Sequence, residues 1–276
     1  SGWTPLLSAA AGGHVDSAKL LLEAGADKDR AGNQGYAPLH HAAIKGNADC
    51  LKLLLEAGAD EDRATNEGLA PLHFAARKGD LDCLKVLLDA GADTDRANNE
   101  GLAPLHLAAI DGHADCVKLL LEAGADKDIA DNEGYTPLHF AAGKGNADCA
   151  KLLLEAGADK DPAADTGFTP MHSAAENGHT ACLELLLEAG AAVDPPHMLP
   201  DARGHVFFCV QGAPMARSHA DFLTRGHCWI GCMVMCPNTE MFSRCPWIEK
   251  GSSRAHNTHI CIWRRGGSFA GTAASA

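Results

Sequence analysis

The chain has 276 residues, of which 46% are hydrophobic, so it is long enough for one large domain or two smaller ones with a buried core. Its formal net charge of −13 excludes a general nucleic-acid binder, because neutralising phosphates requires clustered Lys and Arg. The longest dense apolar stretch, CWIGCMVMC at 228–236, is too short to span a bilayer, and the sequence contains no secretory signal. We expect a soluble protein of the cytoplasm, or alternatively the nucleus. The chain starts at Ser1 rather than Met, which leaves open whether the N-terminus is complete.

A proline recurs every 33 residues, which indicates a repeat protein. The prolines are Pro5, Pro38, Pro71, Pro104, Pro137 and Pro170. In the unit APLHHAAIKGNADCLKLLLEAGADEDRATNEG, Pro38 suits the first position of a short helix and Gly46 suits the left-handed cap that ends it. A second helix is predicted over about 48–57, ended by Gly58. Its apolar face comprises Cys50, Leu51, Leu54 and Leu55.

Two such short helices cannot bury their apolar faces alone, so each unit must stack on its neighbours. The motifs TPLHFAA at 136–142 and GNADCAKLLLEAGAD at 145–159, repeated in phase, resemble the ankyrin repeat. The resemblance covers residues 1–195 and implies an all-α solenoid of about six helix-turn-helix units joined by β-turn loops. It further implies a cupped shape, with the loops as fingers and the first helices as palm, and a non-enzymatic domain that binds other proteins.

Three units depart from the motif at the start of the first helix. Ala37, Ala70 and Ala103 stand where Thr4, Thr136 and Thr169 stand in the other units. We expect the three Ala units to lack a side-chain cap that is typically worth ~1 kcal/mol. Two further departures are Leu7 in place of the motif His and Met171 in place of the motif Leu.

Polar and sulfur-containing residues that recur in phase are interpreted as scaffold. The spacing of Asp126, Asp128, Asp131 and Glu133 does not fit a calcium loop, because Gly134 follows the acids instead of dividing them, and short Asp side chains commonly bond nearby backbone N–H groups. The TPLH histidines have no nucleophile in phase, so we expect structural hydrogen bonding from His40, His73, His106, His139 and His172. The Cys residues that recur once per unit are predicted to be reduced core residues: Cys50, Cys83, Cys116, Cys149 and Cys182.

Positions that vary between units are the candidates for partner binding, because aromatic and Arg side chains often dominate interface energy. The fingertip column holds Tyr36, Leu69, Leu102, Tyr135 and Phe168. A palm column holds His41, Phe74, Leu107, Phe140 and Ser173, of which we expect Phe74, Leu107 and Phe140 to contact a partner. In a third column, occupied by Arg30, Arg63, Arg96, Ile129 and Pro162, we expect the same of the three arginines. The alternative is that the fingertip side chains only pack on adjacent loops.

The charge of the repeat region suggests the kind of partner. Residues 1–195 carry 15 Lys and Arg against 32 Asp and Glu, a balance of −17. We expect a monomeric scaffold or adaptor module without a cofactor, whose partner is a protein with a basic surface. Two alternatives stay open, namely that the charge only keeps the solenoid soluble and that the array is a structural spacer.

The repeat pattern stops after Pro195. Residues 196–276 carry eight Lys and Arg against four Asp and Glu, and hold six Cys and six His, which indicates a separate, irregular or disordered tail. Zinc could be ligated by Cys228, Cys232, Cys236 and Cys245, although their spacing matches no paired zinc-finger pattern. The alternative function is thus a metal-binding or catalytic C-terminal region to which the array brings substrate. A translation artefact from a shifted reading frame or an intron is a further alternative.

Overall fold

The computed structural model describes residues 2–193 with their side chains, and beyond them the backbone of four short strands at 198–200, 206–209, 230–234 and 260–263. The chain divides into two compact domains, Ser1–Val193 and Asp194–Ala276. Within the described part of the chain, no helix combines the length and the apolar character that crossing a membrane would need.

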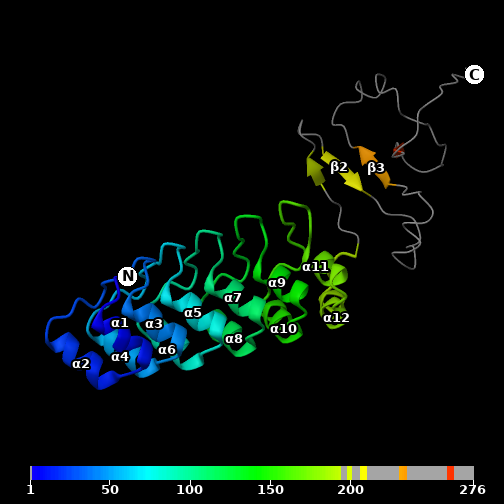
Figure 1. The fold of residues 1–276 in the computed structure, drawn as a ribbon. Coiled ribbons are helices and arrows are strands. Elements are labelled where there is room, and N and C mark those ends of the chain that lie inside the picture. Colours follow the sequence, from blue (N-terminus) through cyan, green and yellow to red (C-terminus); the bar gives the residue numbers. More distant parts are fainter. Residues whose placement is uncertain (1, 194–197, 201–205, 210–229, 235–259, 264–276) are drawn as a thin grey trace, which may run out of the picture. The chain divides into compact units, whose positions relative to one another are not determined.

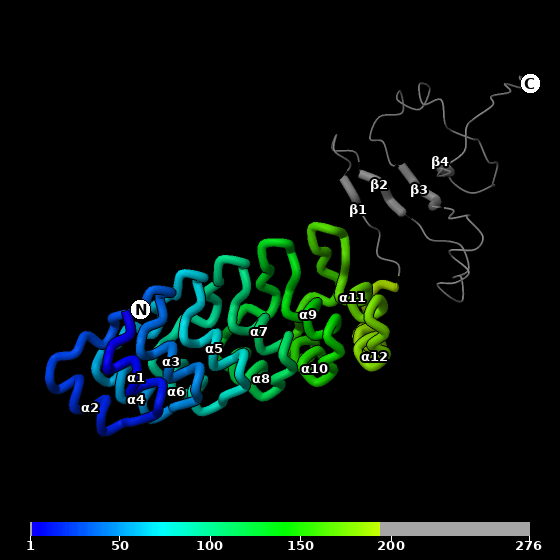
Figure 2. Tube along the Cα trace, viewed as in Figure 1, coloured from blue at the N-terminus to red at the C-terminus, as the bar shows by residue number. Residues whose placement is uncertain are grey.

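Residues 2–193 form twelve helices in six pairs, which confirms the predicted all-α solenoid (Figure 1). The first helices of successive pairs pack side by side in one layer, and the second helices form the other layer (Figure 2). The first helices are α1 (Pro5–Gly12), α3 (Pro38–Lys45), α5 (Pro71–Lys78), α7 (Pro104–Asp111), α9 (Pro137–Lys144) and α11 (Pro170–Glu176). The second helices are α2 (Val15–Glu23), α4 (Ala48–Glu56), α6 (Leu81–Asp89), α8 (Ala114–Glu122), α10 (Ala147–Glu155) and α12 (Thr180–Glu188).

Local sequence sets the helix ends as predicted. Every first helix begins at its Pro, whose missing N–H costs nothing at that position. At Gly46, the cap of α3, φ is 77°, a left-handed conformation that a residue with a side chain adopts at a cost. The predicted second helix over 48–57 is observed as Ala48–Glu56.

The core lies between the two helix layers and consists mainly of Leu, Ala and Cys. The five Cys predicted to belong to it are free and buried. Burial raises the pKa of Cys83 to about 12 and that of Cys116 and Cys149 to about 11. These thiols are therefore protonated at neutral pH and pack as small hydrophobic groups.

A ladder of histidines joins each unit to the next. The backbone N–H of Ala70 donates to His73 Nδ1 at 3.0 Å, so the ring hydrogen is on Nε2, which donates to the carbonyl oxygen of Leu102 at 3.1 Å. The same two bonds are made by His40, His106 and His139. Burial lowers the pKa of His40 and of His73 to about 4, which keeps both rings neutral. The expected structural role of these histidines is thus confirmed.

A ladder of aspartates runs along the loops that follow the second helices. Asp60 Oδ1 accepts a hydrogen bond from the N–H of Asp62 at 3.1 Å, and Asp62 Oδ1 accepts one from the N–H of Asp93 in the next unit at 3.0 Å. The alternation of bonds within and between units extends from Asp27 to Asp161. The backbone-bonding role predicted for Asp126 and Asp128 is confirmed by these bonds.

The three Ala units lack a side-chain cap, as expected, but the Thr136 and Thr169 side chains make no cap bond to the helix backbone either. Thr4 Oγ1 accepts a bond from the N–H of Leu7 at 3.2 Å, but the hydroxyls of Thr136 and Thr169 lie against His139 Nδ1 and His172 Nδ1 instead, at 3.0 and 2.8 Å. In the second to sixth repeats, whether they start with Ala or Thr, the imidazole Nδ1 accepts a hydrogen bond from the backbone N–H of the residue before the Pro. The histidine therefore supplies half of a capping box, whichever residue precedes the Pro.

The C-terminal domain, Asp194–Ala276, contains a four-stranded antiparallel sheet in the order β1-β2-β3-β4. The strands are β1 (Met198–Pro200), β2 (Val206–Cys209), β3 (Ile230–Val234) and β4 (Ile260–Trp263). The register places Cys232 opposite Cys209 on one side and Cys261 on the other. The sequence predicts no strand here, because the region shows no sustained alternation. The rest of the predicted tail lies outside the described residues.

Candidate partner-binding groove

The finger loops are held in a continuous row by hydrogen bonds between neighbouring units (Figure 1). The backbone N–H of Asn99 donates to the carbonyl oxygen of Glu67 at 3.1 Å, and that of Asn132 donates to Glu100 at 3.2 Å. The side-chain amides of Asn66, Asn99 and Asn132 each donate to the carbonyl oxygen of the Asn one unit earlier. This bonding fixes the spacing of the fingertip side chains.

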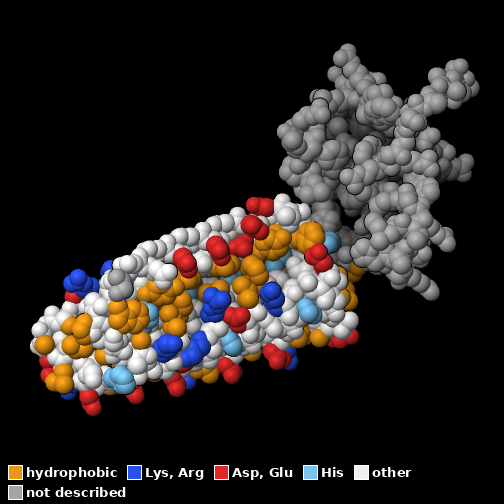
Figure 3. Space-filling view, viewed as in Figure 1, with side chains coloured by type: hydrophobic (Ala, Val, Ile, Leu, Met, Phe, Trp, Pro, Cys, Tyr) orange, Lys and Arg blue, Asp and Glu red, His pale blue; other side chains and the backbone are white. Residues whose placement is uncertain are grey.

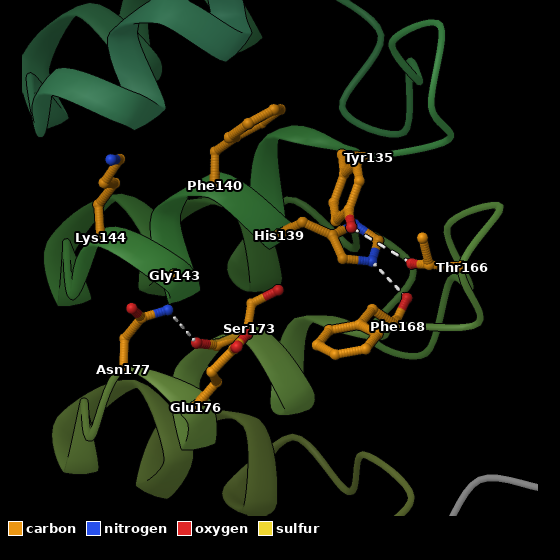
Figure 4. Close-up of a pocket in the computed structure, with 10 residues that line it drawn as sticks. All are labelled: Tyr135, His139, Phe140, Gly143, Lys144, Thr166, Phe168, Ser173, Glu176 and Asn177. Atoms are coloured by element: carbon orange, nitrogen blue, oxygen red, sulfur yellow. Dashed lines mark hydrogen bonds between the residues drawn. The ribbon is translucent and has the colours of Figure 1, made fainter.

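A hollow of about 440 Å³ lies between the finger loop that carries Thr166 and Phe168 and the helices α9 and α11 (Figure 4). The rings of Tyr135, Phe140 and Phe168 line it, together with Gly143 and Ser173. Larger side chains occupy the position of Gly143 in the second to fourth units, namely Ile44, Arg77 and Ile110. The position of Ser173 holds His41, Phe74, Leu107 and Phe140 in the second to fifth units. The hollow exists because the side chains at these two positions, Gly143 on α9 and Ser173 on the neighbouring α11, are both small.

A second hollow, of about 560 Å³, adjoins the first and is lined by Leu102, Tyr135 and Phe140. Its polar lining residues come from two neighbouring fingers: Asn99, Glu100, Asp131, Asn132 and Glu133. Because the two hollows share Tyr135 and Phe140, we treat them as one groove across the fourth to sixth units. Tyr135 and Phe140 are half-buried, with ring centroids 6.0 Å apart, so part of each ring faces the groove.

A second set of aromatic residues lies at the other end of the same two columns. The Tyr36 ring lies 5.7 Å from both His41 and Phe74, and the Trp3 indole lies 4.7 Å from His41 in an edge-to-face arrangement. Trp3 is 52% exposed. The sequence interpretation omitted Trp3, although it stands one repeat period before Tyr36 and the fingertip column extended by one unit would have included it.

The predicted contact residues differ in exposure. Leu69 and Leu107 are buried, at 9% and 8% exposure, so they contribute little to the free surface. Tyr36, Phe74, Leu102, Tyr135, Phe140 and Phe168 are half-buried. Arg30 is exposed and Arg63 and Arg96 are half-buried, but the arginine column does not line the groove. Partner contact by the three arginines therefore stays a prediction, because they do not line the groove that the fingertip and palm columns form.

The charges that line the groove are mostly negative. The carboxylates of Glu100, Glu133 and Glu176 line it beside the ammonium group of Lys144. Asp131 also lines it, and its Oδ1 accepts hydrogen bonds from the N–H groups of Glu133 and Tyr135, which fixes the finger turn. The sequence interpretation missed these acidic positions because it selected columns that vary between units, whereas Glu67, Glu100 and Glu133 keep the same residue at one position in three successive units.

The one imidazole in the groove lining serves the scaffold. Burial lowers the pKa of His139, its Nδ1 accepts from the N–H of Thr136, and its Nε2 donates to the carbonyl oxygen of Phe168 at 3.1 Å. Both ring nitrogens are therefore engaged. The groups of the groove that a ligand can contact are the faces of aromatic rings and exposed carboxylates.

The four cysteines proposed as zinc ligands lie in the C-terminal domain, Asp194–Ala276. Cys228, Cys236 and Cys245 lie outside the described residues, and for Cys232 only the backbone on β3 is described. The metal-binding alternative therefore stays a prediction.

Comparison with known families gives one match. A family model described as ankyrin repeats (3 copies) matches residues 1–65, 60–131 and 123–196, which together cover all six helix pairs. A comparison with curated proteins found no match.

Proposed function

Since this chain belongs to the ankyrin-repeat family, whose repeats generally serve as non-enzymatic protein-binding scaffolds, we propose that it binds a protein partner along the groove between its fingers and palm. Tyr135, Phe140 and Phe168 are the main contact residues, and Tyr36 and Phe74 form a second contact area. The partner surface is basic.

The observation that carries the proposal is the pair of adjoining hollows that share Tyr135 and Phe140. Aromatic side chains in a concave, partly desolvated position are the kind that dominate interface energy, because they bury a large area at a small entropic cost. The −17 balance of the repeat region supports a basic partner, because a surface of one sign attracts the opposite sign over several ångströms. Binding should consequently weaken as salt is added.

The test compares the full chain with the double variant Tyr135→Ala, Phe140→Ala in quantitative affinity capture from a cell extract. We expect the proteins captured by the wild-type chain to fall at least about tenfold in the variant, as expected when interface anchors worth more than about 1.4 kcal/mol are removed. Leu20→Ala is the matched control, because Leu20 is 67% exposed on α2 and away from the groove. Unchanged capture by a double variant with wild-type circular dichroism would refute the proposal.

A further inference from the structure

The fingers carry a row of carboxylates with the period of the array. Glu67, Glu100 and Glu133 occupy the same position in three successive units, and all three are exposed. None of the ion pairs found among residues 2–193 involves them. The row therefore keeps its negative charge available to a ligand.

This row borders the apolar part of the groove. Glu100 and Glu133 line the same hollow as Leu102, Tyr135 and Phe140. Figure 3 shows acidic side chains along one edge of the array, next to a strip of hydrophobic side chains. A ligand that lies along the array thus meets carboxylates on one side and apolar rings on another.

The spacing of the row restricts the conformation of such a ligand. Packed helices lie about 8–10 Å apart, so equivalent carboxylates recur at about that interval along the array. A polyproline II segment advances about 9 Å in each turn of three residues, so it places every third side chain on one face at nearly the same interval. An α-helix advances about 10 Å in seven residues, so it would need a cation at every seventh residue, whereas a polyproline II segment meets the interval with a cation at every third.

From this match we infer that the groove binds a polyproline II segment with Lys or Arg at every third residue. Its basic face lies along Glu67, Glu100 and Glu133, its second face places apolar side chains on Leu102, Tyr135 and Phe140, and its third face points to solvent. Aromatic-lined grooves suit this conformation because the segment is already extended before it binds. The inference rests on the proposed function and adds to it the chemistry and the period of the partner.

Two synthetic peptides of identical composition test the period. The first is KPLKPLKPLKPL, and the second is KKKPLPLKPLPL, in which no two Lys are three residues apart. We expect the periodic peptide to bind the full chain at least about tenfold more tightly, measured by fluorescence anisotropy at low salt. Equal affinity for the two peptides, or no measurable binding of either, would overturn the inference.

A triple variant tests the finger row. In Glu67→Gln, Glu100→Gln, Glu133→Gln, the preference for the periodic peptide should disappear. The control Glu23→Gln, Glu56→Gln, Glu188→Gln removes the same number of exposed charges from the ends of second helices and should retain the preference. A preference that survives in the finger variant would contradict the inference. If capture of cellular proteins still depended on Tyr135 and Phe140, the proposed function would stand without the periodic ligand.

Discussion

The first unit and the interior units share a sequence pattern but differ in what surrounds them. In the first unit Leu7 replaces the histidine that elsewhere bonds the next finger, and Leu20 is 67% exposed. The residues that correspond to Leu20 in the second to sixth units are half-buried: Leu53, Val86, Leu119, Leu152 and Leu185. An apolar residue in the same helix position is thus half-buried or exposed according to its neighbours, so the stability of a unit depends on the units beside it.

The largest expected effect concerns the histidines that the first unit lacks. The folded pKa of His40 and of His73 is about 4, below the value of about 6.5 in an unfolded chain, so acid protonates the unfolded state first. The stability they contribute is fully present above pH 6.5 and is lost as the pH falls to about 4, roughly 3 kcal/mol for each ring. Denaturant unfolding between pH 7 and pH 4 measures the loss.

The variant His73→Leu, which gives the third unit the residue of the first, should make this pH dependence shallower. At neutral pH it should also destabilise the fold by about 2 kcal/mol, because the N–H of Ala70 and the carbonyl oxygen of Leu102 lose a buried partner. An unchanged slope with pH would show that other groups cause the acid sensitivity.

The next effect separates buried from exposed leucines. Leu120→Ala empties a fully buried position in α8 and should lower the free energy of unfolding by about 3 kcal/mol. Leu20→Ala on the exposed face of the first unit should cost less than about 0.5 kcal/mol. Urea titrations of both variants give the comparison, and equal losses would contradict the expected dependence on burial.

The smallest effect concerns the aspartate ladder. Asp62→Ala removes the acceptor of a bond from the next unit, and should cost about 1 kcal/mol, whereas Asp62→Asn keeps an acceptor oxygen and should cost less. Asp27, at the end of the ladder, accepts only from Asp29 in its own loop, so Asp27→Ala should cost less than Asp62→Ala. Thermal melting ranks the three variants, and a larger loss from Asp27→Ala would reverse the expected order.

The fold could be predicted because its determinants are local and repeated. Pro38 and Gly46 specify the ends of a helix through their own backbone preferences, and the Leu spacing specifies its buried face. The bonds between units could not be predicted in this way. That His73 rather than a threonine completes the helix start follows only from the position of Leu102 in the neighbouring unit.

The groove was partly predictable. The columns of Tyr135 and Phe140 were identified from variation between units, but the burial of each side chain in these columns was not. Leu69 is short and buried, whereas the longer Tyr135 reaches Thr166 of the next finger with its hydroxyl at 3.2 Å. The hollow itself depends on Gly143 and Ser173, whose small size is informative only once α9 and α11 are known to lie side by side.

The ladders also bear on how such a chain can change its length. Each ladder repeats one separation from unit to unit: the histidine bonds His40 to Leu69 and His73 to Leu102 both span 29 residues, and the aspartate bonds between units span 31. A duplication or loss of one complete 33-residue period therefore brings matching donors and acceptors together at the new junction. The groove would lengthen or shorten by one finger, so genetic recombination between repeats could alter ligand length without requiring a new interface.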